Sequence, residues 1–333
     1  MAVLITGGAG FIGSNFVRHR VASHPDERVV VYDALTYAGN RASLADLEER
    51  ISFVHGDICD QARVEQVLSE HDIDVVVNFA AESHNSLAVV DPGRFFRTNV
   101  LGTQILLEGA RRVGLRRFHH VSTCEVYGDL ALDSPDRFTE ESPYRPRTPY
   151  NASKAGADHA VRAYAETYGL AVTITNCCNN YGPYQFPEKV IPLFATNALD
   201  GNPLPLYAST LNRREWLHVD DHCRAIDAVL ERGEVGETYH VGSGLEASIE
   251  QVADHILAAL DRPSSLKTIV PDRPGHDRRY LLDSSKIRSA LGWEPLTSFE
   301  AGMADTVAWY EANRAWWEPL RDRAPVEETA WVR

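Results

Sequence analysis

Two short stretches carry the side chains best suited to acid–base chemistry. Thr123, Cys124 and Glu125 bring a hydroxyl, a thiol and a carboxylate to the end of an apolar run that predicts a buried strand. Tyr150 and Lys154 lie four residues apart at the start of a helical pattern, so their side chains share one helix face. An ammonium beside a phenol favours the phenolate, and we therefore expect Tyr150 to remove a proton below its ordinary pKa of about 10.

A Tyr–Lys pair at this spacing is by itself a weak signal, because most such pairs lie on a solvated helix face. Support comes from the start of the chain, where an apolar strand runs into a glycine-rich turn and a helical pattern. The glycines follow the spacing G-x-x-G-x-x-G, a variant of the dinucleotide-binding fingerprint. They permit a tight turn and the close approach of a pyrophosphate, which the helix N-terminus can bind. The cofactor-binding residues predicted here are Gly7, Gly10, Phe11, Ile12 and Gly13.

An acidic residue follows the next strand at the distance expected for recognition of a ribose. Asp33 ends the apolar run at residues 28–32, about 20 residues past the last glycine, where a carboxylate accepts hydrogen bonds from the adenosine ribose hydroxyls. A carboxylate there repels a 2′-phosphate, so the sequence favours NAD over NADP. A strand-end aspartate that caps a turn is the alternative, and the glycines make it the less favoured one.

Two further turns are placed to contact the same cofactor. Asp57 and Ile58 follow the third predicted strand, where the adenine edge would lie. Small residues follow the fourth strand and let the backbone run along the nicotinamide half; these are Ala80, Ala81 and Ser83. His84, at the end of this turn, could reach a sugar hydroxyl or could be an ordinary surface-loop histidine.

Strands and helices alternate through the first half of the chain, which predicts a Rossmann-type, doubly wound parallel sheet of the α/β class. One of the expected helices spans residues 91–111. From about Asn176 proline and glycine become frequent and the alternation fades. We therefore expect an NAD-binding domain at residues 1–176 and a smaller, mixed α/β substrate domain at residues 177–333, with some chain crossing back near residues 215–245.

Composition excludes several classes of function. The 333 residues carry a formal net charge of −14, which disfavours non-specific binding of nucleic acid. No run of about 18 apolar residues is present, so we expect no membrane span, and no secretory signal precedes the first strand, so we expect a cytoplasmic protein. Five scattered cysteines without a C-x-x-C spacing indicate neither a disulfide framework nor a metal site.

The second half of this acidic chain holds basic residues on separate loops. Arg213 and Arg214 precede a predicted strand, and the stretch DRPGHDRRY at residues 272–280 adds further arginines. Guanidinium groups that converge from two loops suit a diphosphate. Solvated surface charge is the alternative explanation.

These pieces together resemble the extended short-chain dehydrogenase/reductase family, and within it the dTDP-glucose 4,6-dehydratases. The matching stretches cover nearly the whole chain: TGGAGFIGSNF, YDALTYAGN, GDICD, NFAAESH, YNASKAGADH, NNYGPYQFPEKVIP, REWLHVDDH and DRPGHDRRY. The last three are specific to nucleotide-sugar dehydratases. The resemblance therefore implies NAD as cofactor, a nucleotide-diphosphate sugar such as dTDP-glucose as substrate, and a homodimer formed through two long helices. The substrate-binding residues that follow are Ser83, His84, Asn179, Asn180, Glu188, Lys189, Arg214, Arg273 and His276.

The resemblance also implies a role for each reactive side chain. Tyr150 takes the proton of the sugar 4-hydroxyl while C4 gives hydride to NAD. Lys154 holds the ribose and lowers the pKa of the tyrosine, and Thr123 hydrogen-bonds the 4-keto oxygen. Glu125 removes the C5 proton, an acid protonates the departing 6-hydroxyl, and hydride returns to C6. The implied activity is 4,6-dehydration of a nucleotide sugar to a 4-keto-6-deoxy product.

Three departures from the family pattern lie around the sugar. The dehydratases carry Asp-Glu after the threonine, and here Cys124 stands at the position of the acid. They carry Val-Asp-Arg-Ser after the histidine, and here residues 85–88 read NSLA. They carry Arg before the Asn-Asn-Tyr-Gly stretch, and here Asn176 stands in its place. A thiol is mostly protonated at pH 7, so Cys124 could still act as the acid, although burial beside Glu125 would raise its pKa further. A cysteine that only fills space, with the acid lost, is an equally weighted alternative.

The changed sugar pocket leaves other outcomes open. A 4-epimerase would need Thr123, Tyr150 and Lys154 but no base at C5, so the presence of Glu125 weighs against it. A 5,6-dehydratase would use Glu125 and Cys124 for the elimination and return hydride to C4. A non-catalytic regulator that binds the cofactor on the same fold is the third possibility, and the complete Thr-Tyr-Lys set weighs against it.

Overall fold

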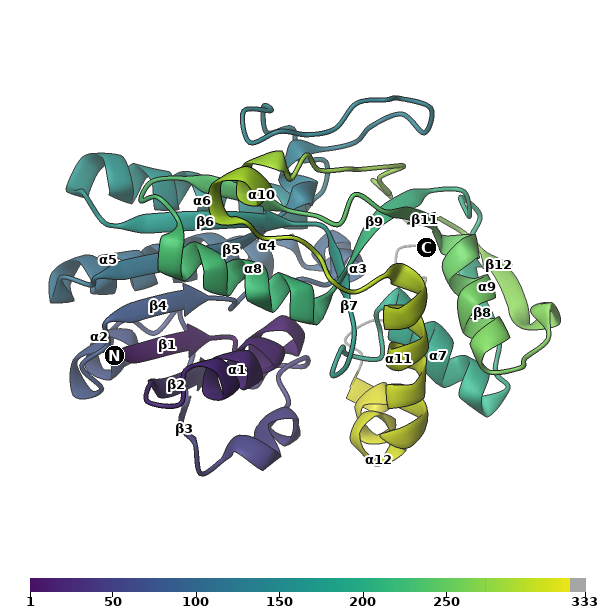
Figure 1. Ribbon diagram of the computed structural model, residues 1–333, viewed down its shortest axis with the longest axis horizontal. Coiled ribbons are helices and arrows are strands. Elements are labelled where there is room, and N and C mark those ends of the chain that lie inside the picture. Colours follow the sequence, from purple (N-terminus) through teal and green to yellow (C-terminus); the bar gives the residue numbers. More distant parts are fainter. Residues whose placement is uncertain (273, 324–333) are drawn as a thin grey trace.

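A seven-stranded sheet forms the centre of the computed structural model, which describes residues 1–272 and 274–323 (Figure 1). Every neighbouring pair of its strands is parallel, and the strand order is β10-β6-β5-β4-β1-β2-β3. The chain winds outward from β1 in both directions, which confirms the expected doubly wound sheet. The strands are β1 (Ala2–Thr6), β2 (Arg28–Asp33), β3 (Ile51–His55), β4 (Val75–Asn78), β5 (Arg117–Thr123), β6 (Val172–Cys177) and β10 (Thr238–Val241).

Helices cover both faces of this sheet because its inner strands are apolar on both sides. Successive side chains alternate between the faces, so Val3 and Leu4 belong to two different hydrophobic clusters. One face packs against α2 (Gln61–Glu70), α5 (Thr103–Val113) and α6 (Pro149–Tyr168). The other packs against α1 (Phe11–Ser23) and α8 (Val219–Arg232).

The helix expected near residues 91–111 is present, but its first half is not regular α-helix. The segment contains α4 (Pro92–Phe95), a π-helical turn η2 (Phe96–Gly102) and only then α5, and a further helix, α3 (Asn85–Val90), precedes them. The wide turn places the buried Asn99 toward the loop after β4, where its side chain donates to the carbonyl of Glu82 and accepts from the Glu82 N–H. A π-turn inside a helix commonly marks a functional site.

A smaller body follows the sheet and has its own hydrophobic core, on the right of Figure 1. It contains a three-stranded sheet in the order β11-β9-β7 and a two-stranded sheet, β12-β8, packed by three helices. The elements are β7 (Asn179–Tyr181), α7 (Val190–Asp200), β8 (Leu204–Tyr207), β9 (Arg213–His218), β11 (Glu246–Ser248), α9 (Ile249–Ala259), β12 (Lys267–Val270), α11 (Phe299–Ala312) and α12 (Arg314–Trp317). Between β9 and β11 the chain returns to the large sheet through α8 and β10, and α10 (Ser285–Leu291) packs beside β10.

Short 3₁₀ helices complete the connections between these elements. Four of them are η1 (Arg41–Leu47), η3 (Cys124–Tyr127), η4 (Ser264–Leu266) and η5 (Glu318–Arg323). Only η3 lies among the predicted catalytic residues. It begins directly after β5, with the hydroxyl of Thr123 as its N-cap.

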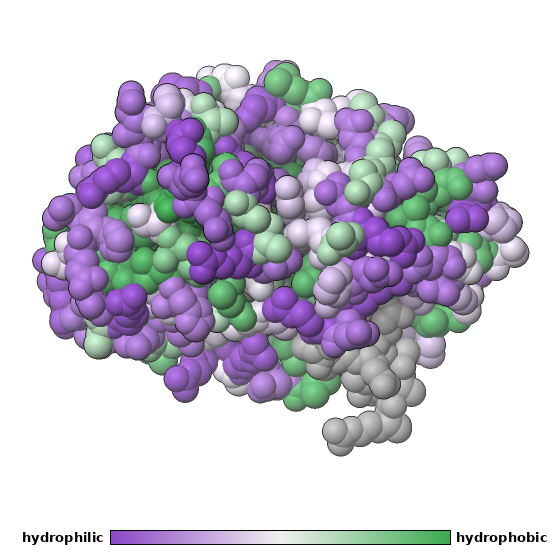
Figure 2. All heavy atoms as spheres, turned by 90° about the horizontal axis from the view of Figure 1, so that it is seen from below, coloured by the Kyte–Doolittle hydropathy of each residue, from purple (hydrophilic) through white to green (hydrophobic). Residues whose placement is uncertain are grey.

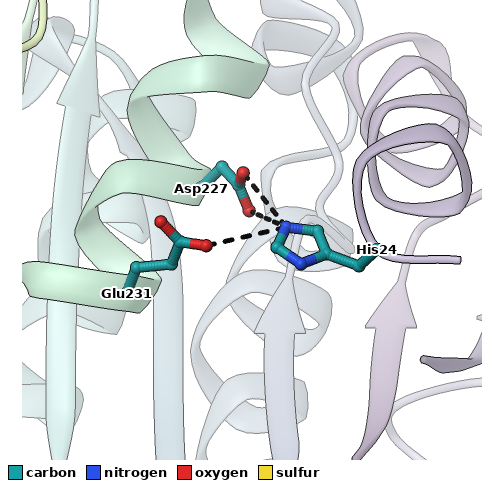
Figure 3. A group of neighbouring side chains, drawn as sticks. All are labelled: His24, Asp227 and Glu231. Atoms are coloured by element: carbon teal, nitrogen blue, oxygen red, sulfur yellow. Dashed lines mark hydrogen bonds and ion pairs between the residues drawn. The ribbon is translucent and has the colours of Figure 1, made fainter. Parts of the chain in front are cut away.

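A cluster of polar side chains joins α1 to α8 on the surface of the large body (Figure 3). His24 Nε2 lies 3.2 Å from Asp227 and 3.8 Å from Glu231, and these three residues could in principle hold a metal ion. Asp227 is already engaged by the guanidinium of the buried Arg20 and by His19. Although burial opposes it, the hydrogen bond from His19 and the charge of Arg20 hold the pKa of Asp227 below its usual range. We therefore interpret the cluster as an ion-pair contact between the two helices.

The surface is mainly polar on the face shown in Figure 2, with smaller hydrophobic areas between the charged groups. Within residues 1–272 and 274–323, no helix is both long enough and apolar enough to cross a bilayer.

Candidate active site

The glycine-rich turn after β1 has the geometry of a phosphate-binding loop. Gly7 has φ +66°, and a Cβ atom there would lie 2.7 Å from the backbone nitrogen of Ala80. A Cβ atom at Gly13 would lie 2.2 Å from the carbonyl oxygen of Gly7. Gly10 is the N-cap of α1 and makes no side-chain hydrogen bond to the first N–H groups of the helix. These N–H groups are therefore left for an anion, at a turn whose backbone requires glycine.

Asp33 lies at the end of β2, beside this turn. Its carboxylate accepts hydrogen bonds from the N–H of Ala9 at 2.9 Å and the N–H of Leu35 at 2.7 Å. Burial raises the pKa of Asp33, and the two N–H donors oppose that effect. The carboxylate therefore braces the glycine-rich turn and caps the turn after β2, which is the alternative role considered from the sequence, while its place beside a ribose stays a prediction.

The turns after β3 and β4 lie at the same edge of the sheet. Ile58 is buried, with its side chain close to Gly102, and the carbonyl of Asp57 accepts a hydrogen bond from the hydroxyl of Tyr32. After β4, Ala80 and Ala81 bring no large side chain to the edge. Parallel strands end at one edge, and this edge therefore collects the predicted cofactor residues.

A second loop meets the turn after β4. Lys189 Nζ donates to the carbonyl of Ser83 at 2.9 Å, and His84 Nε2 lies 3.2 Å from a carboxylate oxygen of Glu188. His84 also caps α3, because its Nδ1 accepts from the N–H of Leu87. Burial raises the pKa of Glu188. The structure thus brings four of the predicted substrate-binding residues together. Both ring nitrogens of His84 contact other groups of the protein.

The predicted catalytic residues converge from three elements. Thr123 ends β5, Glu125 lies in η3, and Tyr150 and Lys154 lie in the first turns of α6. The hydroxyl of Thr123 accepts from the Glu125 N–H at 3.3 Å and also hydrogen-bonds the phenol of Tyr150. α6 begins at Pro149 and is capped by Thr148, whose hydroxyl accepts from the N–H of residue 151.

The protonation of Tyr150 differs from the expectation. Burial raises the pKa of the phenol well above its ordinary value, the charge of Glu125 raises it further, and the hydrogen bond with Thr123 lowers it. Lys154 Nζ donates to the carbonyl of Val121 at 2.8 Å and lies 3.3 Å from Nε2 of His120. The net pKa of Tyr150 is therefore raised where the sequence predicted a lowered one, because desolvation and the charge of Glu125 dominate.

Cys124 is buried directly beside Glu125. Burial raises the pKa of the thiol well above its ordinary value, and the charge of Glu125 adds to this, as predicted. Asn85 lies on the other side of Glu125, and its Nδ2 donates to the carboxylate at 3.4 Å. The thiol therefore carries its proton, and the carboxylate has a polar neighbour at one of the positions where the chain departs from the family pattern.

The same departure changes the surroundings of Tyr150. Leu87, Ala88 and Phe95 form a small hydrophobic cluster, and the ring of Tyr150 packs against it. The rings of Phe95 and Tyr150 meet edge to face, with 6.3 Å between their centroids. An apolar wall thus covers one side of the phenol.

The remaining predicted substrate-binding residues are mostly engaged within the protein. The guanidinium of Arg214 donates to the carbonyl of Asp277 at 2.6 Å and lies over the ring of Tyr280. Asn180 is held by His222, and Asn179 accepts from the hydroxyl of Tyr280. His276 contacts Ser209 and the ring of Tyr207, and Arg273 lies outside the described residues.

Two residues that support the site escaped the sequence prediction. Asp158 lies four residues beyond Lys154, and that spacing was a usable signal for a neighbouring charge on the same helix face. Asn99 binds both the Glu82 backbone and the hydroxyl of Ser153. No spacing in the sequence signals Asn99, because its partners belong to other elements.

Comparison with known proteins identifies the family. A family model described as GDP-mannose 4,6 dehydratase matches residues 4–306. The dTDP-glucose 4,6-dehydratase of Mycobacterium tuberculosis (strain CDC 1551 / Oshkosh) is 51% identical over 323 residues, which cover 97% of each chain. The chain belongs to the nucleotide-sugar 4,6-dehydratase family.

Two further members of this family support the assignment over the full length. The dTDP-glucose 4,6-dehydratase of Streptomyces niveus is 49% identical, with coverage of 99% of this chain and 98% of the relative. The crystal structure of DesIV, a dTDP-glucose 4,6-dehydratase from Streptomyces venezuelae solved with NAD bound, superposes with a TM-score of 0.93 at 52% identity, and the match covers 96% of this chain and 100% of that one. The family's fold is therefore retained in this chain.

Glu215 gives a prediction for the pH dependence of stability. This buried carboxylate accepts from the N–H groups of Gly244 and Leu282, and burial raises its pKa to about 7 from 4.5. The folded protein holds this proton more tightly than the unfolded chain, so the free energy of unfolding should fall as the pH rises between these two values. Glu215→Gln should remove that fall, as measured by melting temperature between pH 4.5 and pH 7.

The exposed Glu49 supplies the control for this measurement. Glu49→Gln should keep the pH dependence of the unchanged protein. An equal slope in the Glu215→Gln variant and the unchanged protein would show that Glu215 does not titrate in this range.

Proposed function

We propose that this protein is an NAD-dependent dTDP-glucose 4,6-dehydratase, which converts a dTDP-glucose-like nucleotide sugar to the 4-keto-6-deoxy product. The observation that carries the proposal is the convergence of Thr123, Glu125, Tyr150 and Lys154 at the sheet edge that also holds the glycine-rich turn. Relatives about half identical over the full length carry out this named activity.

The residues present fit NAD. Gly7, Gly10 and Gly13 leave the turn free of side chains, and the start of α1 offers N–H groups to a pyrophosphate. Asp33 places a carboxylate at the ribose position, with lone pairs beyond the two that its backbone partners use. When bound, NAD supplies a temporary acceptor for the hydrogen and electron pair that pass from C4 to C6.

The first half of the reaction needs a base at the 4-hydroxyl. Tyr150 takes that proton, and Thr123, which already hydrogen-bonds the phenol, is placed to hold the oxygen as it becomes a ketone. The phenol must first release its own proton to solvent, and the raised pKa that burial gives Tyr150 opposes that step. The resulting ketone acidifies the proton on C5.

The second half removes water across C5 and C6. Glu125 takes the C5 proton, and the C6–O bond breaks as Cys124 gives its proton to the departing hydroxyl. Glu125 then returns a proton to C5. Because Tyr150 ends the cycle with one extra proton and Cys124 with one fewer, turnover also requires a proton to pass from the phenol to the thiolate.

Two alternatives make different demands on the same residues. A 4-epimerase would have no use for Glu125, which Asn85 and the Thr123 hydroxyl hold in place. A 5,6-dehydratase would use Glu125 and Cys124 as described but return hydride to C4. The product distinguishes all three, since only 4,6-dehydration gives a C6 methyl group beside a ketone.

The same family membership supports a placement of the substrate. We assign Ser83, His84, Glu188 and Lys189 to the sugar side, since they meet beside the nicotinamide half of the predicted cofactor site. Asn179, Asn180, Arg214, Arg273 and His276 are assigned to the nucleotide-diphosphate part. We assign residues 1–176 to the cofactor and 177–333 to the nucleotide sugar, with the segment near residues 215–245 shared between them.

All five cysteines are free, which supports a reducing compartment such as the cytoplasm.

A homodimer is supported by an apolar surface on one side of the large sheet. Phe96, Leu101, Val113 and Tyr168 are all exposed, and they lie on η2, at the end of α5 and at the end of α6. Exposed apolar side chains grouped on neighbouring helices are typical of a subunit interface. A second copy of this chain would cover them.

Asp33→Arg should weaken NAD binding, because it removes the acceptor at the ribose and two backbone contacts of the turn. The dissociation constant should rise about 10- to 100-fold, since hydrogen bonds to a charged group contribute about 1.5–3 kcal/mol. Titration calorimetry with NAD measures it. Asp26→Arg, an equal change of charge at an exposed position, is the control and should bind as the unchanged protein does. Equal NAD affinity in both variants would show that the cofactor does not contact Asp33.

Cys124→Ala should slow water loss by about 10²- to 10⁴-fold, the usual cost of a missing general acid. Cys124→Asp should keep or raise the rate on dTDP-glucose, and Glu125→Gln should stop elimination while C4 oxidation continues in part. Product made in D₂O should carry deuterium at C5, as read by NMR.

Cys223→Ala is the matched control for the Cys124 variants, since Cys223 is a buried thiol on α8. It should leave the rate of water loss unchanged. A product that keeps its 6-hydroxyl and its original hydrogen at C5 would rule out 4,6-dehydration.

Leu101→Asp should dissociate the dimer, because it places a charge in the proposed interface. Sedimentation velocity at micromolar concentration should then report a monomer. Ile269→Asp, at an exposed position on β12, should leave the dimer intact. A monomeric unchanged protein would refute the proposed interface.

A further inference from the structure

Helix α6 carries a row of four reactive side chains, each one turn beyond the last. Tyr150, Lys154, Asp158 and Arg162 are separated by four residues each and therefore follow one face of the helix. Lys154 and Asp158 are both buried, with 4% and 0% of their surface exposed. A charged group in such a place is costly unless it has a partner of opposite charge.

The carboxylate of Asp158 is fixed by three donors from three different segments. Its Oδ2 accepts from the hydroxyl of Ser122 at 2.9 Å, the hydroxyl of Tyr144 at 2.8 Å and Nδ2 of Asn176 at 3.3 Å. Three hydrogen bonds to one oxygen stabilise negative charge on the group. The donors thus hold a buried anion one helical turn from Lys154.

Lys154 depends on that anion for its own charge. Burial lowers the pKa of Lys154, and Asp158 is the strongest influence that raises it. His120 lies between the two groups, with Nε2 3.3 Å from Lys154 Nζ and 3.5 Å from Oδ1 of Asp158. Burial first, and then the charge of Lys154, push the pKa of His120 well below its ordinary value, so the imidazole is neutral and supplies no charge.

Other titratable groups face Asp158 from the surrounding elements. Arg162 lies on α6 and donates to the hydroxyl of Tyr144, which lies in the segment before α6. Tyr127 of η3 contacts Tyr144 edge to face, and burial raises the pKa of both phenols, so both are neutral. The charges at this position are therefore two cations, Lys154 and Arg162, on either side of one anion.

We propose that Asp158 is a positioning residue for the reaction: its carboxylate keeps Lys154 charged and so sets the alkaline limit of the pH range in which Tyr150 works. The inference rests on the proposed function, since it requires Lys154 to act beside Tyr150. Asp158 acts on Lys154 through its charge. It is also linked to Thr123 through Asn176, whose Nδ2 donates both to Asp158 and to the carbonyl of Thr123 at 3.1 Å.

The pH profile of kcat for water loss tests this role. Asp158→Asn keeps the shape of the side chain and removes its charge, so Lys154 should lose its proton more readily. The alkaline limb should move to lower pH by about 1–3 units, the usual effect of one close opposite charge, while the acidic limb stays in place. A loss of kcat that is equal at every pH, or a lower melting temperature with both limbs unmoved, would overturn the proposal.

Two further variants complete the test. Ser122→Ala removes a donor to Asp158 without changing its charge, and its alkaline limb should stay near that of the unchanged protein. Arg162→Gln, at a half-buried position, removes the cation that competes for Asp158, so its alkaline limb should move to higher pH. If Asp158→Asn does not fold, an unmoved limb in Arg162→Gln overturns the proposal by itself. Formation of the 4-keto product by the unchanged protein tests the proposed function separately.

Discussion

The buried ammonium of Lys154 is the constraint around which the catalytic edge is arranged. It can stay charged inside the protein only because the carbonyl of Val121 accepts from it and Asp158 lies one turn away. The contact with Val121 requires α6 to lie against β5, since Val121 belongs to that strand. α6 also packs closely against η2, where Gly156 faces Val100 and a Cβ atom would come within 3.1 Å of the valine side chain. The positions of Tyr150 and Thr123 follow from the same docking.

Much of the large sheet could be predicted because its signals are local. Apolar runs separated by helical patterns predicted the strands and their parallel arrangement. The glycine spacing predicted a tight turn at Gly7, which has a positive φ. The π-turn at residues 96–102 could not be predicted, because its cause is the bonding of Asn99 to a loop from another strand. The pKa of Tyr150 was mispredicted for a related reason. A sequence shows that a lysine is four residues away but does not show that the phenol packs against an apolar cluster beside Glu125.

Two of the departures from the family pattern meet at one carboxylate. Cys124 lies beside Glu125 on η3, and Asn85 reaches it from α3. The thiol stands where the family carries a second carboxyl group, and the amide of Asn85 donates to Glu125 at 3.4 Å. The residues predicted to bind the cofactor show no such departures. The departures therefore lie among the residues predicted to surround the sugar.

The second body is joined to the first by buried polar groups as well as by an apolar cluster, which contains Leu217 of β9 together with Val126 of η3. Glu215 on β9 accepts from the N–H groups of Gly244 and Leu282, and Arg214 beside it donates to the carbonyl of Asp277. These two side chains fix the loops that come back from β10 and that precede α10. Each is buried and bonded to backbone groups, so neither can shift without leaving buried polar groups unpaired. These loops are consequently held by β9, from which the chain crosses to β10 and back.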